Sequence, residues 1–415
     1  MRVIEGTSMR TIAVAACSLD PPGGGAERSL CTLINGLLIP GPAFEEHLNF
    51  RPLSPTNLEN IQNLEEWNIA SCHAHSGDLT GLLDDRIKKK ILKIPTESLW
   101  SGLAWRLRSK HTGLSEPRLY RRHLRRTNHH FAKLVTNWLD EMPTLPQLGI
   151  TQLTWSAGAA EAFRRKGIPY LIFIRDDVPF RFPEIFRSAI EGAICVCTAG
   201  EGLGRQVSEI FTMQRNANIP LAIDYEKRFI DFNHVNKWRK EGLANRLDRQ
   251  SPRFAIVGVT PEKGLEAYER LFPHLHKHWP EAHFDIYGSG HYVERLGLQP
   301  NATTHGHVPI EQAFASTDVH VIIGETAGTW GRVINEAGVF GVPTVTCGIG
   351  SQPEALGPGG VIVYDHHDII QFSDALRDCW NRREELGKLA FEHAGVTDHR
   401  RAVSIFRTLL EDLNT

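Results

Sequence analysis

The feature that most constrains this fold is the alternation of short apolar runs with stretches of helical period. Buried-strand candidates occupy residues 11–17, 170–174 and 193–197, and later 254–257, 284–287 and 319–323. A glycine-rich turn follows the first run, and then Leu30, Leu33, Ile34, Leu37 and Leu38 recur at helical spacing. Short apolar runs between turns are typical of strands covered on both faces. The pattern therefore predicts α/β architecture with doubly wound parallel sheets.

The domain organisation is read from a change in composition near the middle of the chain. With 415 residues, the chain is long enough for two or three domains. Between residues 222 and 252 it becomes polar and charged, and a second α/β series then begins. We expect two Rossmann-like domains, residues 1–225 and 250–398, facing each other across a cleft. A last helix at about 400–415 is expected to pack back on the first domain.

Composition excludes several classes of function. A net charge of −2 argues against a general role in binding nucleic acid. The apolar runs are too short to span a membrane, so a cytoplasmic protein is predicted. Seven cysteines are too few for a disulfide framework in a chain of this length. Cys72-His73-Ala74-His75 has no second Cys/His pair at a suitable spacing, so we interpret it as a loop and expect no metal site.

Three glycine-bearing turns, each between a predicted strand and a predicted helix, are candidates for binding an anion. They are residues 23–25, 263–264 and 328–331. A helix amino terminus offers free N–H groups and a favourable dipole of about 0.3 to 1 kcal/mol. A lysine at ~4 Å contributes roughly 4 kcal/mol at an effective dielectric near 20, so Lys263 should dominate the binding of a diphosphate. Neither a Walker motif nor a complete G-x-G-x-x-G is present at residues 23–25.

Glu336 is a lone carboxylate in a helix expected to begin near Arg332. It lies just over one turn inside, on a different face from Val333 and Ile334. In that position it suits two hydrogen bonds to vicinal hydroxyls, such as those of a ribose. The alternative is an acid favoured by the helix dipole, and spacing alone leaves the two equal.

Three segments together resemble the nucleotide-sugar glycosyltransferases of family four, which are retaining enzymes of the GT-B fold. They are "TWGRVINEAGVFGVPTVTCGIGSQPEALGPGG", "GVTPEKGL" and "GGGAERSL". The resemblance extends to "GIPYLIFIRDD" in the first half and "HGHV" in the second, and so covers most of the chain. The first segment is the most specific, because Glu336, Gly341-Val342-Pro343 and Pro353-Glu354 keep the family's order and spacing.

The resemblance implies an acceptor-binding first domain and a second domain that binds a nucleotide sugar. Lys263 would hold the donor diphosphate with the amides of Arg332 and Val333, and Glu336 would bind its ribose. The remaining implied contacts are Trp330 and Gly331 to the sugar, His307 and Val308 to the base, Gly328 and Thr329 in the turn, and Gly24 and Gly25 beside the phosphates.

The chain departs from the family pattern at three positions. A sugar-binding glutamate usually stands where this chain has Gly328, and Glu325 is a candidate replacement. The arginine before the lysine turn is replaced at Gly258, and a strand-end histidine corresponds to Arg175. We expect Arg175 to contribute the missing phosphate contact through its planar fork. Asp176 either orients the acceptor hydroxyl or serves only as a cap.

The expected reaction is transfer of a sugar to an acceptor hydroxyl with retention, for glycan, glycolipid or polysaccharide synthesis. No cofactor or essential metal is expected. A sugar-nucleotide epimerase, an inactive binding module and an interaction protein built on the basic segment are the alternatives. Residues 86–126 are basic and carry Trp100 and Trp105, which suits peripheral contact with an anionic membrane and a lipid-linked acceptor. A soluble anionic acceptor or a solvated face is equally open.

Overall fold

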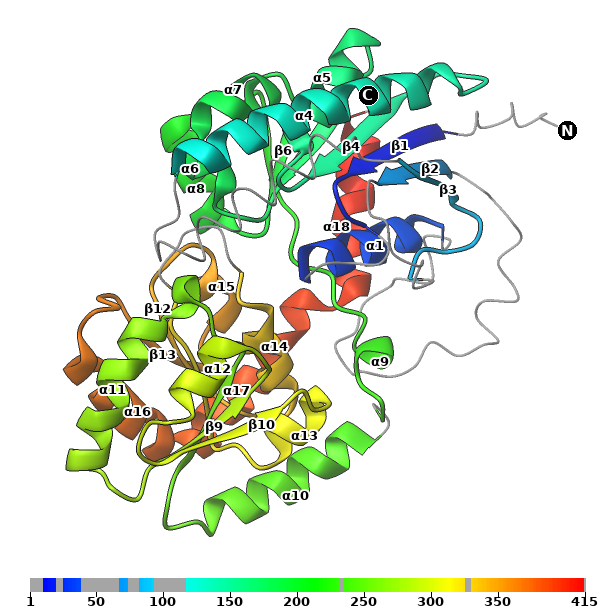
Figure 1. Ribbon diagram of the computed structural model, residues 1–415. Coiled ribbons are helices and arrows are strands. Elements are labelled where there is room, and N and C mark those ends of the chain that lie inside the picture. Colours follow the sequence, from blue (N-terminus) through cyan, green and yellow to red (C-terminus); the bar gives the residue numbers. More distant parts are fainter. Residues whose placement is uncertain are drawn as a thin grey trace, which may run out of the picture.

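Two parallel β-sheets organise the protein into two lobes (Figure 1). The computed structural model describes residues 10–19, 25–38, 67–73, 82–92, 117–231, 234–324 and 330–413. The first sheet has seven strands in the order β3-β2-β1-β4-β5-β6-β7, and the second has six in the order β10-β9-β8-β11-β12-β13. Every strand pairing among the described residues is parallel, which confirms the predicted α/β class.

The strands are short, as expected for runs covered on both faces. In the first lobe they are β1 (Arg10–Ala16), β2 (Trp67–His73), β3 (Lys88–Ile91), β4 (Leu148–Gln152), β5 (Tyr170–Ile174), β6 (Cys195–Thr198) and β7 (Asn216–Asn218). In the second they are β8 (Arg253–Val257), β9 (His283–Tyr287), β10 (Ala302–Gly306), β11 (Val319–Ile322), β12 (Thr344–Cys347) and β13 (Gly360–Val363).

Helices cover both faces of each sheet. Those of the first lobe are α1 (Gly25–Leu37), α4 (Pro117–Asp140), α5 (Ser156–Arg165), α6 (Val178–Arg181), α7 (Pro183–Glu191) and α8 (Glu201–Ile210). Those of the second are α11 (Leu265–His278), α12 (His291–Leu296), α13 (Ile310–Ala315), α14 (Arg332–Val339), α15 (Gln352–Leu356), α16 (Ile369–Asn381) and α17 (Arg383–Ala394), with the 3₁₀ turn η3 (Pro261–Lys263) before α11.

Strand β1 shows why the first sheet is doubly wound. Ala13 and Ala15 point into the core under α4, α5 and α7, whereas Val14 and Ala16 point into the core that includes α1. Successive side chains of a strand alternate between faces, so an unbroken apolar run supplies two cores at once. This is the physical reason that the apolar runs in the sequence identified strands correctly.

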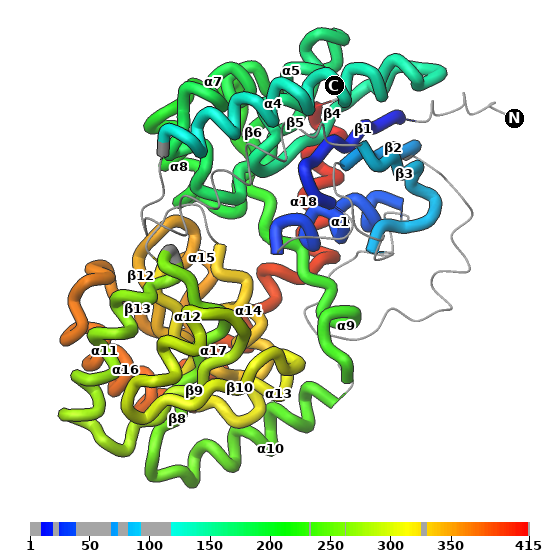
Figure 2. Tube along the Cα trace, viewed as in Figure 1, coloured from blue at the N-terminus to red at the C-terminus, as the bar shows by residue number. Residues whose placement is uncertain are grey.

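The chain crosses between the lobes twice, and the last helix returns to the first lobe (Figure 2). Helix α18 (His399–Asp412) packs against α1, and its Val403 and Phe406 are fully buried in the first-lobe core. The two crossings are joined by backbone hydrogen bonds from Ile223 to Thr397 and from His399 to Ile223, of 2.8 and 3.1 Å. The two crossing segments therefore run side by side where the lobes meet.

The polar stretch between the two α/β series is helical rather than irregular. It contains α9 (Tyr225–Arg228) and α10 (Val235–Leu247). Arg246 of α10 is buried and donates hydrogen bonds to the carbonyls of Phe314, Thr317 and Phe340. A buried guanidinium needs such acceptors, and they fasten α10 to the second lobe.

One sequence interpretation is wrong. Cys72 and His73 were expected in a loop, but they are the last residues of β2 and are buried. The strand lacks a continuous apolar run, so its sequence gives no strand signal. Pairing with both β1 and β3 forms it instead.

Replacement of Phe406 with Ala tests the attachment of α18 to the first lobe. Phe406 is fully buried and its ring meets that of Phe173 at 5.7 Å. We expect Phe406→Ala to lower the free energy of unfolding by about 3–5 kcal/mol because it leaves a cavity in the core. Denaturant unfolding measures this, with the exposed Ser404→Ala of the same helix as the control. Equal stability of the two variants would contradict the assignment of α18 to that core.

Candidate functional site

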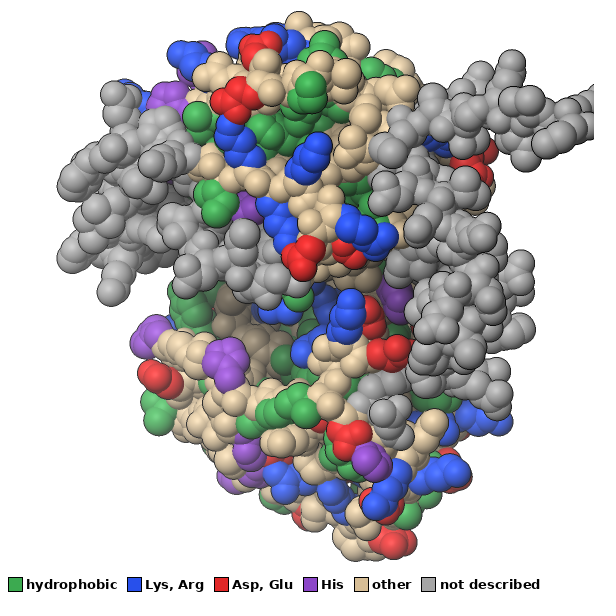
Figure 3. Space-filling model, turned by 90° about the vertical axis from the view of Figure 1, so that its right-hand side faces the viewer, with side chains coloured by type: hydrophobic (Ala, Val, Ile, Leu, Met, Phe, Trp, Pro, Cys, Tyr) green, Lys and Arg blue, Asp and Glu red, His purple; other side chains and the backbone are tan. Residues whose placement is uncertain are grey.

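The switch points of the two sheets locate the candidate site. The connections reverse direction between β1 and β4 in the first sheet and between β8 and β11 in the second. Ligands of doubly wound sheets bind beside the carboxyl ends of the strands at such points. Lys263 follows β8, and the segment from Trp330 to Glu336 follows β11. Figure 3 shows a recess between the two lobes with Lys and Arg side chains beside it.

Lys263 lies at the end of the turn after β8 with its side chain exposed. Among the described residues, its ammonium group has no hydrogen-bond or ion-pair partner. The next residue, Gly264, has φ of +75°, and a Cβ there would lie 2.6 Å from Cβ of Ile323 at the end of β11. This contact needs glycine, and it holds the lysine turn against the neighbouring strand.

The structure explains why no arginine stands at Gly258. This residue has φ of +71°, a conformation that favours glycine. A Cβ built at Gly258 would lie 3.4 Å from Nζ of Lys263. The ammonium group of Lys263 therefore stands directly beside Gly258, at ordinary contact distance.

The turn before α14 is held by buried polar contacts. Trp330 is 5% exposed and donates through Nε1 to Oδ1 of Asn335 at 2.7 Å. Asn335 in turn donates to the carbonyl of Ala355 at 2.8 Å. The helix begins at Arg332, as predicted, after Gly331 in the left-handed conformation. The amides of Arg332 and Val333 belong to the first turn, so they have no acceptor within the helix.

Glu336 is the most buried charge of this segment, with 3% of its side chain exposed. Its Oε1 accepts hydrogen bonds from Nε of Arg228 at 2.7 Å and from Nε of Arg332 at 2.9 Å. Burial alone would raise the pKa of this carboxyl, but the charges of Arg332 and Arg228 hold the pKa below its ordinary value. Within the described part of the chain, Oε2 receives no hydrogen bond. This oxygen remains available to a ligand.

The two lobes contact each other beside these residues. A Cβ added to Gly25, at the start of α1, would lie 3.4 Å from Cδ of Arg332. Glu354 of α15 accepts hydrogen bonds from the amides of Glu201, at 2.7 Å, and Gly202. Those amides open α8, which has no side-chain cap of its own. The carboxylate therefore caps a helix of the opposite lobe.

Arg175 of the first lobe is 8% exposed and is only partly satisfied. It donates through Nη1 to Oγ of Ser29 at 2.6 Å, and its guanidinium lies over the ring of Phe173. Nε and Nη2 are buried and have no hydrogen-bond partner among the described residues. Burial lowers the pKa of Arg175 to about 10. These two nitrogens are unused hydrogen-bond donors at the carboxyl end of β5.

Asp176 follows Arg175 and is partly buried. Its Oδ1 accepts a hydrogen bond at 3.2 Å from the amide of Val178, the first residue of the short helix α6, whose cap residue is Asp177. Burial, together with the charges of Asp177 and Glu27, raises the pKa of Asp176 to about 7. Burial, followed by the charges of Glu27 and Asp176, raises the pKa of the Cys17 thiol to about 12.

Glu27 of α1, Cys17 after β1 and Asp176 after β5 therefore lie near one another, at the carboxyl ends of the strands of the first sheet. Sequence reasoning did not select Glu27. The sequence did contain a signal for this residue, because Glu27 is an acid in the first turn of the helix that follows the glycine-rich turn.

The other predicted site residues are divided between described and undescribed segments. His307 is exposed and pairs with Oγ of Ser289 at 2.8 Å, and Val308 packs against the second-lobe core. Gly24, Glu325, Gly328 and Thr329 lie outside the described residues. Their predicted roles stay predictions.

The described ranges contain neither a cluster of metal-binding side chains nor a membrane-spanning helix. Within them, no group of three His, Cys, Asp or Glu side chains is arranged to hold a metal ion. No described helix combines the length and apolar character needed to cross a membrane. Of the basic segment 86–126, residues 93–116 lie outside the described ranges, and these contain both of its tryptophans.

Comparison with known proteins agrees with this geometry. Residues 251–382 match the family model "Glycosyl transferases group 1". The fold is similar to that of HepE from Anabaena, solved in complex with UDP and glucose, with a TM-score of 0.62 and 15% identity over 98% of this chain and 100% of HepE. It is also similar to sucrose-phosphate synthase from Thermosynechococcus elongatus, with a TM-score of 0.68 and 14% identity over 98% and 99% of the two chains.

A third similar structure is the UDP-forming alpha,alpha-trehalose-phosphate synthase from Burkholderia vietnamiensis. Its TM-score is 0.63 at 12% identity, over 98% of this chain and 99% of that one. No curated protein sequence matches this chain. The structural matches confirm the predicted GT-B fold, and the residues that match the group 1 glycosyl transferase model lie in the second lobe.

The raised pKa of Asp176 predicts a pH dependence of stability. Between its ordinary value of 3.8 and about 7, the native carboxyl holds a proton that the unfolded chain has lost. The free energy of unfolding contributed by Asp176 therefore falls as pH rises through this window. Asp176→Asn removes this pH-dependent contribution. The free energy of unfolding of the variant, relative to that of the wild type, should therefore rise by about 1–2 kcal/mol between about pH 4 and about pH 8, because partial solvent contact weakens the effect.

Urea denaturation across this pH range measures the difference. Glu209→Gln is the matched control, since Glu209 is exposed. A constant difference between Asp176→Asn and wild type at all pH values would show that the native carboxyl titrates normally.

Proposed function

We propose that this protein is a retaining glycosyltransferase that moves a sugar from a nucleoside diphosphate sugar to an acceptor hydroxyl. The observation that carries the proposal is Lys263, whose ammonium group has no partner among the described residues. It stands at the second-sheet switch point inside the matched glycosyl transferase region. An exposed cation in this place suits a donor diphosphate.

The donor site is assembled from the two turns after β8 and β11. Lys263 supplies the charge, and the amides of Arg332 and Val333 supply N–H donors at the amino end of α14. Glu336 would bind ribose hydroxyls through Oε2, because its Oε1 already accepts from Arg228 and Arg332. His307 and Val308 would lie against the base.

In the transfer step, the acceptor oxygen forms a bond to the anomeric carbon while the bond from that carbon to the diphosphate oxygen breaks. The departing phosphate oxygen takes the proton of the acceptor hydroxyl on the same face of the sugar. The contribution of the protein is to position the two substrates and to stabilise the departing charge. Arg175 would direct its Nε and Nη2 toward that charge. Asp176 would orient the acceptor, while the proton of the reacting hydroxyl goes to the phosphate oxygen.

The first donor to examine is UDP-glucose, because HepE, which shares the fold, was crystallised with it. The acceptor class proposed is a glycan or a lipid-linked glycan. Contact of residues 86–126 with an anionic membrane would supply the second kind, and the described part of this segment has exposed arginines on α4, among them Arg118, Arg122 and Arg126.

The test is incubation with nucleotide sugars, with and without candidate acceptors. Nucleotide release that requires an acceptor supports transfer, and NMR of the product anomer then reports retention. An altered free nucleotide sugar would indicate an epimerase, and binding without turnover would indicate an inactive module.

We expect Lys263→Met to reduce donor affinity by roughly a hundredfold, from the loss of about 3 kcal/mol. Unchanged turnover after EDTA treatment is expected as well.

Glu336→Gln tests the ribose contact. We expect UDP, GDP and ADP to lose affinity by a similar factor of about ten, because a charge-assisted hydrogen bond is replaced by a neutral one. A 2′,3′-dideoxy nucleotide should bind both proteins equally, since it offers no hydroxyl. Calorimetry measures the affinities.

Glu311→Gln is the control for Glu336→Gln. Glu311 is also a buried glutamate of the second lobe, where it accepts from the amide of Ile230. If the dideoxy analogue lost as much affinity as UDP, the effect of Glu336→Gln would be structural and the ribose contact would be wrong.

A further inference from the structure

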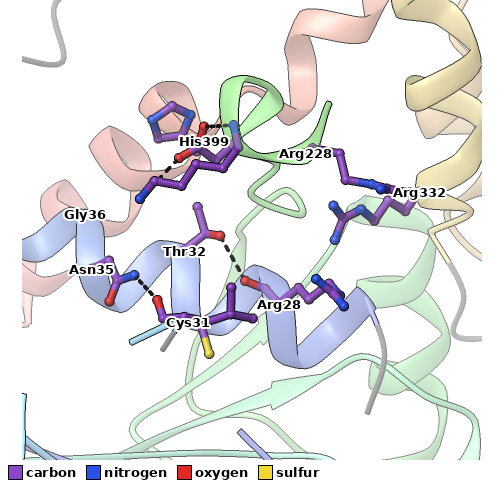
Figure 4. A pocket seen from close by; sticks show the side chains of 11 residues that line it. Arg28, Cys31, Thr32, Asn35, Gly36, Arg228, Arg332 and His399 are labelled. Carbon is purple, nitrogen blue, oxygen red and sulfur yellow. Dashed lines mark hydrogen bonds and ion pairs between the residues drawn. The ribbon is translucent and has the colours of Figure 1, made fainter. Parts of the chain in front are cut away.

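A second candidate site lies where α1, α9, α14 and α18 meet. There the structure has a pocket of about 120 Å³ whose lining includes Arg28, Arg228, Arg332, Lys227, Thr32 and Asn35. Figure 4 shows the guanidinium groups of Arg28, Arg228 and Arg332 gathered at one end of it. One water needs roughly 10–15 Å³ of such space, so the pocket has room for a larger group. Lys263 and the other residues of the turn between β8 and α11 are not part of its lining.

The charges at the arginine end are not balanced. Arg228 and Arg332 share one carboxylate, that of Glu336, and Arg28 stands beside them without a salt bridge within the described part of the chain. Burial, and then the repulsion from Arg332 and Arg228, lowers the pKa of Arg28. Three positive charges thus face one negative charge. Asp224, the acid in the pocket lining, lies 3.8 Å from Lys227 and caps α9.

The unused donors point to the kind of ligand. Arg228 and Arg332 both use Nε for Oε1 of Glu336. Their Nη nitrogens, and the whole guanidinium of Arg28, have no hydrogen bond to any described residue. Paired N–H groups on planar forks match phosphate oxygens, which accept two parallel hydrogen bonds.

We propose that this pocket binds a phosphate group, as a phosphate monoester or a diphosphate. The three arginines come from α1 of the first lobe, from α9 in the crossing segment and from α14 of the second lobe. A bound phosphate therefore joins both lobes and the segment between them. Because the ligand binds the arrangement in which the three elements converge, it stabilises that arrangement of the lobes by mass action.

The phosphate has two possible sources, which share this chemistry. It is either the diphosphate of a nucleotide bound in the site of Lys263 or a separate phosphorylated molecule. The two are distinguished by competition: UDP displaces pyrophosphate from the pocket in the first case and binds together with it in the second.

The experiment is calorimetric titration of the full chain with pyrophosphate at fixed ionic strength. We expect Arg28→Gln to weaken binding about tenfold or more, through loss of a charge-assisted contact, and Arg28→Lys to restore part of it, because the charge remains without the fork. The same loss is expected when Arg28→Gln is made in a Lys263→Met background, which removes the main cation of the donor site. Thermal melting checks that the variants are folded.

The proposal is overturned if Arg28→Gln changes pyrophosphate affinity less than twofold in the wild-type protein, or if it changes that affinity less than twofold in the Lys263→Met background. Neither result depends on turnover. An absence of sugar transfer would contradict the proposed function and leave this binding measurement unaffected.

Discussion

The buried carboxylate of Glu336 is the interaction on which the arrangement of the candidate site depends. An acid with 3% of its side chain exposed is costly unless it is paired, and the pairing here is with Arg332 of its own helix and Arg228 of the crossing segment. Removing one partner from a buried pair typically costs about 3–5 kcal/mol. Glu336 therefore ties the amino end of α14 to the path of the chain between the lobes, and it brings two arginines to the edge of a pocket.

Contacts between the lobes use the same small region. Glu354 caps α8 across the interface, and a buried apolar cluster joins Ala199 and Leu221 of the first lobe to Trp330 and Ile334 of the second. Trp330 and Ile334 flank the start of α14, so the turn that presents its amides is part of the interface. The residues that open α14 therefore also hold the two lobes together.

The structure accounts for some of the departures from the family pattern, whereas others lie outside the described residues. The missing arginine at Gly258 is explained, because the left-handed backbone there favours glycine and Lys263 occupies the adjacent space. Arg175 has two buried nitrogens without described partners, so it has donors to spare for a phosphate. Gly328 and Glu325 lie outside the described residues, and the exchange between them is still a prediction from the sequence.

The α/β class with parallel sheets and the start of α14 could be predicted from the sequence, because unbroken apolar runs and a glycine before a helix are local signals. The sequence also selected Lys263, since a lysine beside a glycine turn needs no distant partner to be recognised. It named six of the thirteen strands that the structure describes. Among those that it missed is β2, whose pairing rather than its composition makes it a strand. The partners of Glu336 could be identified only from the folded structure. The same holds for the cluster of Arg28, Arg228 and Arg332, because packing brings these residues together from three separate elements. Their spacing along the chain does not indicate that they are close in space.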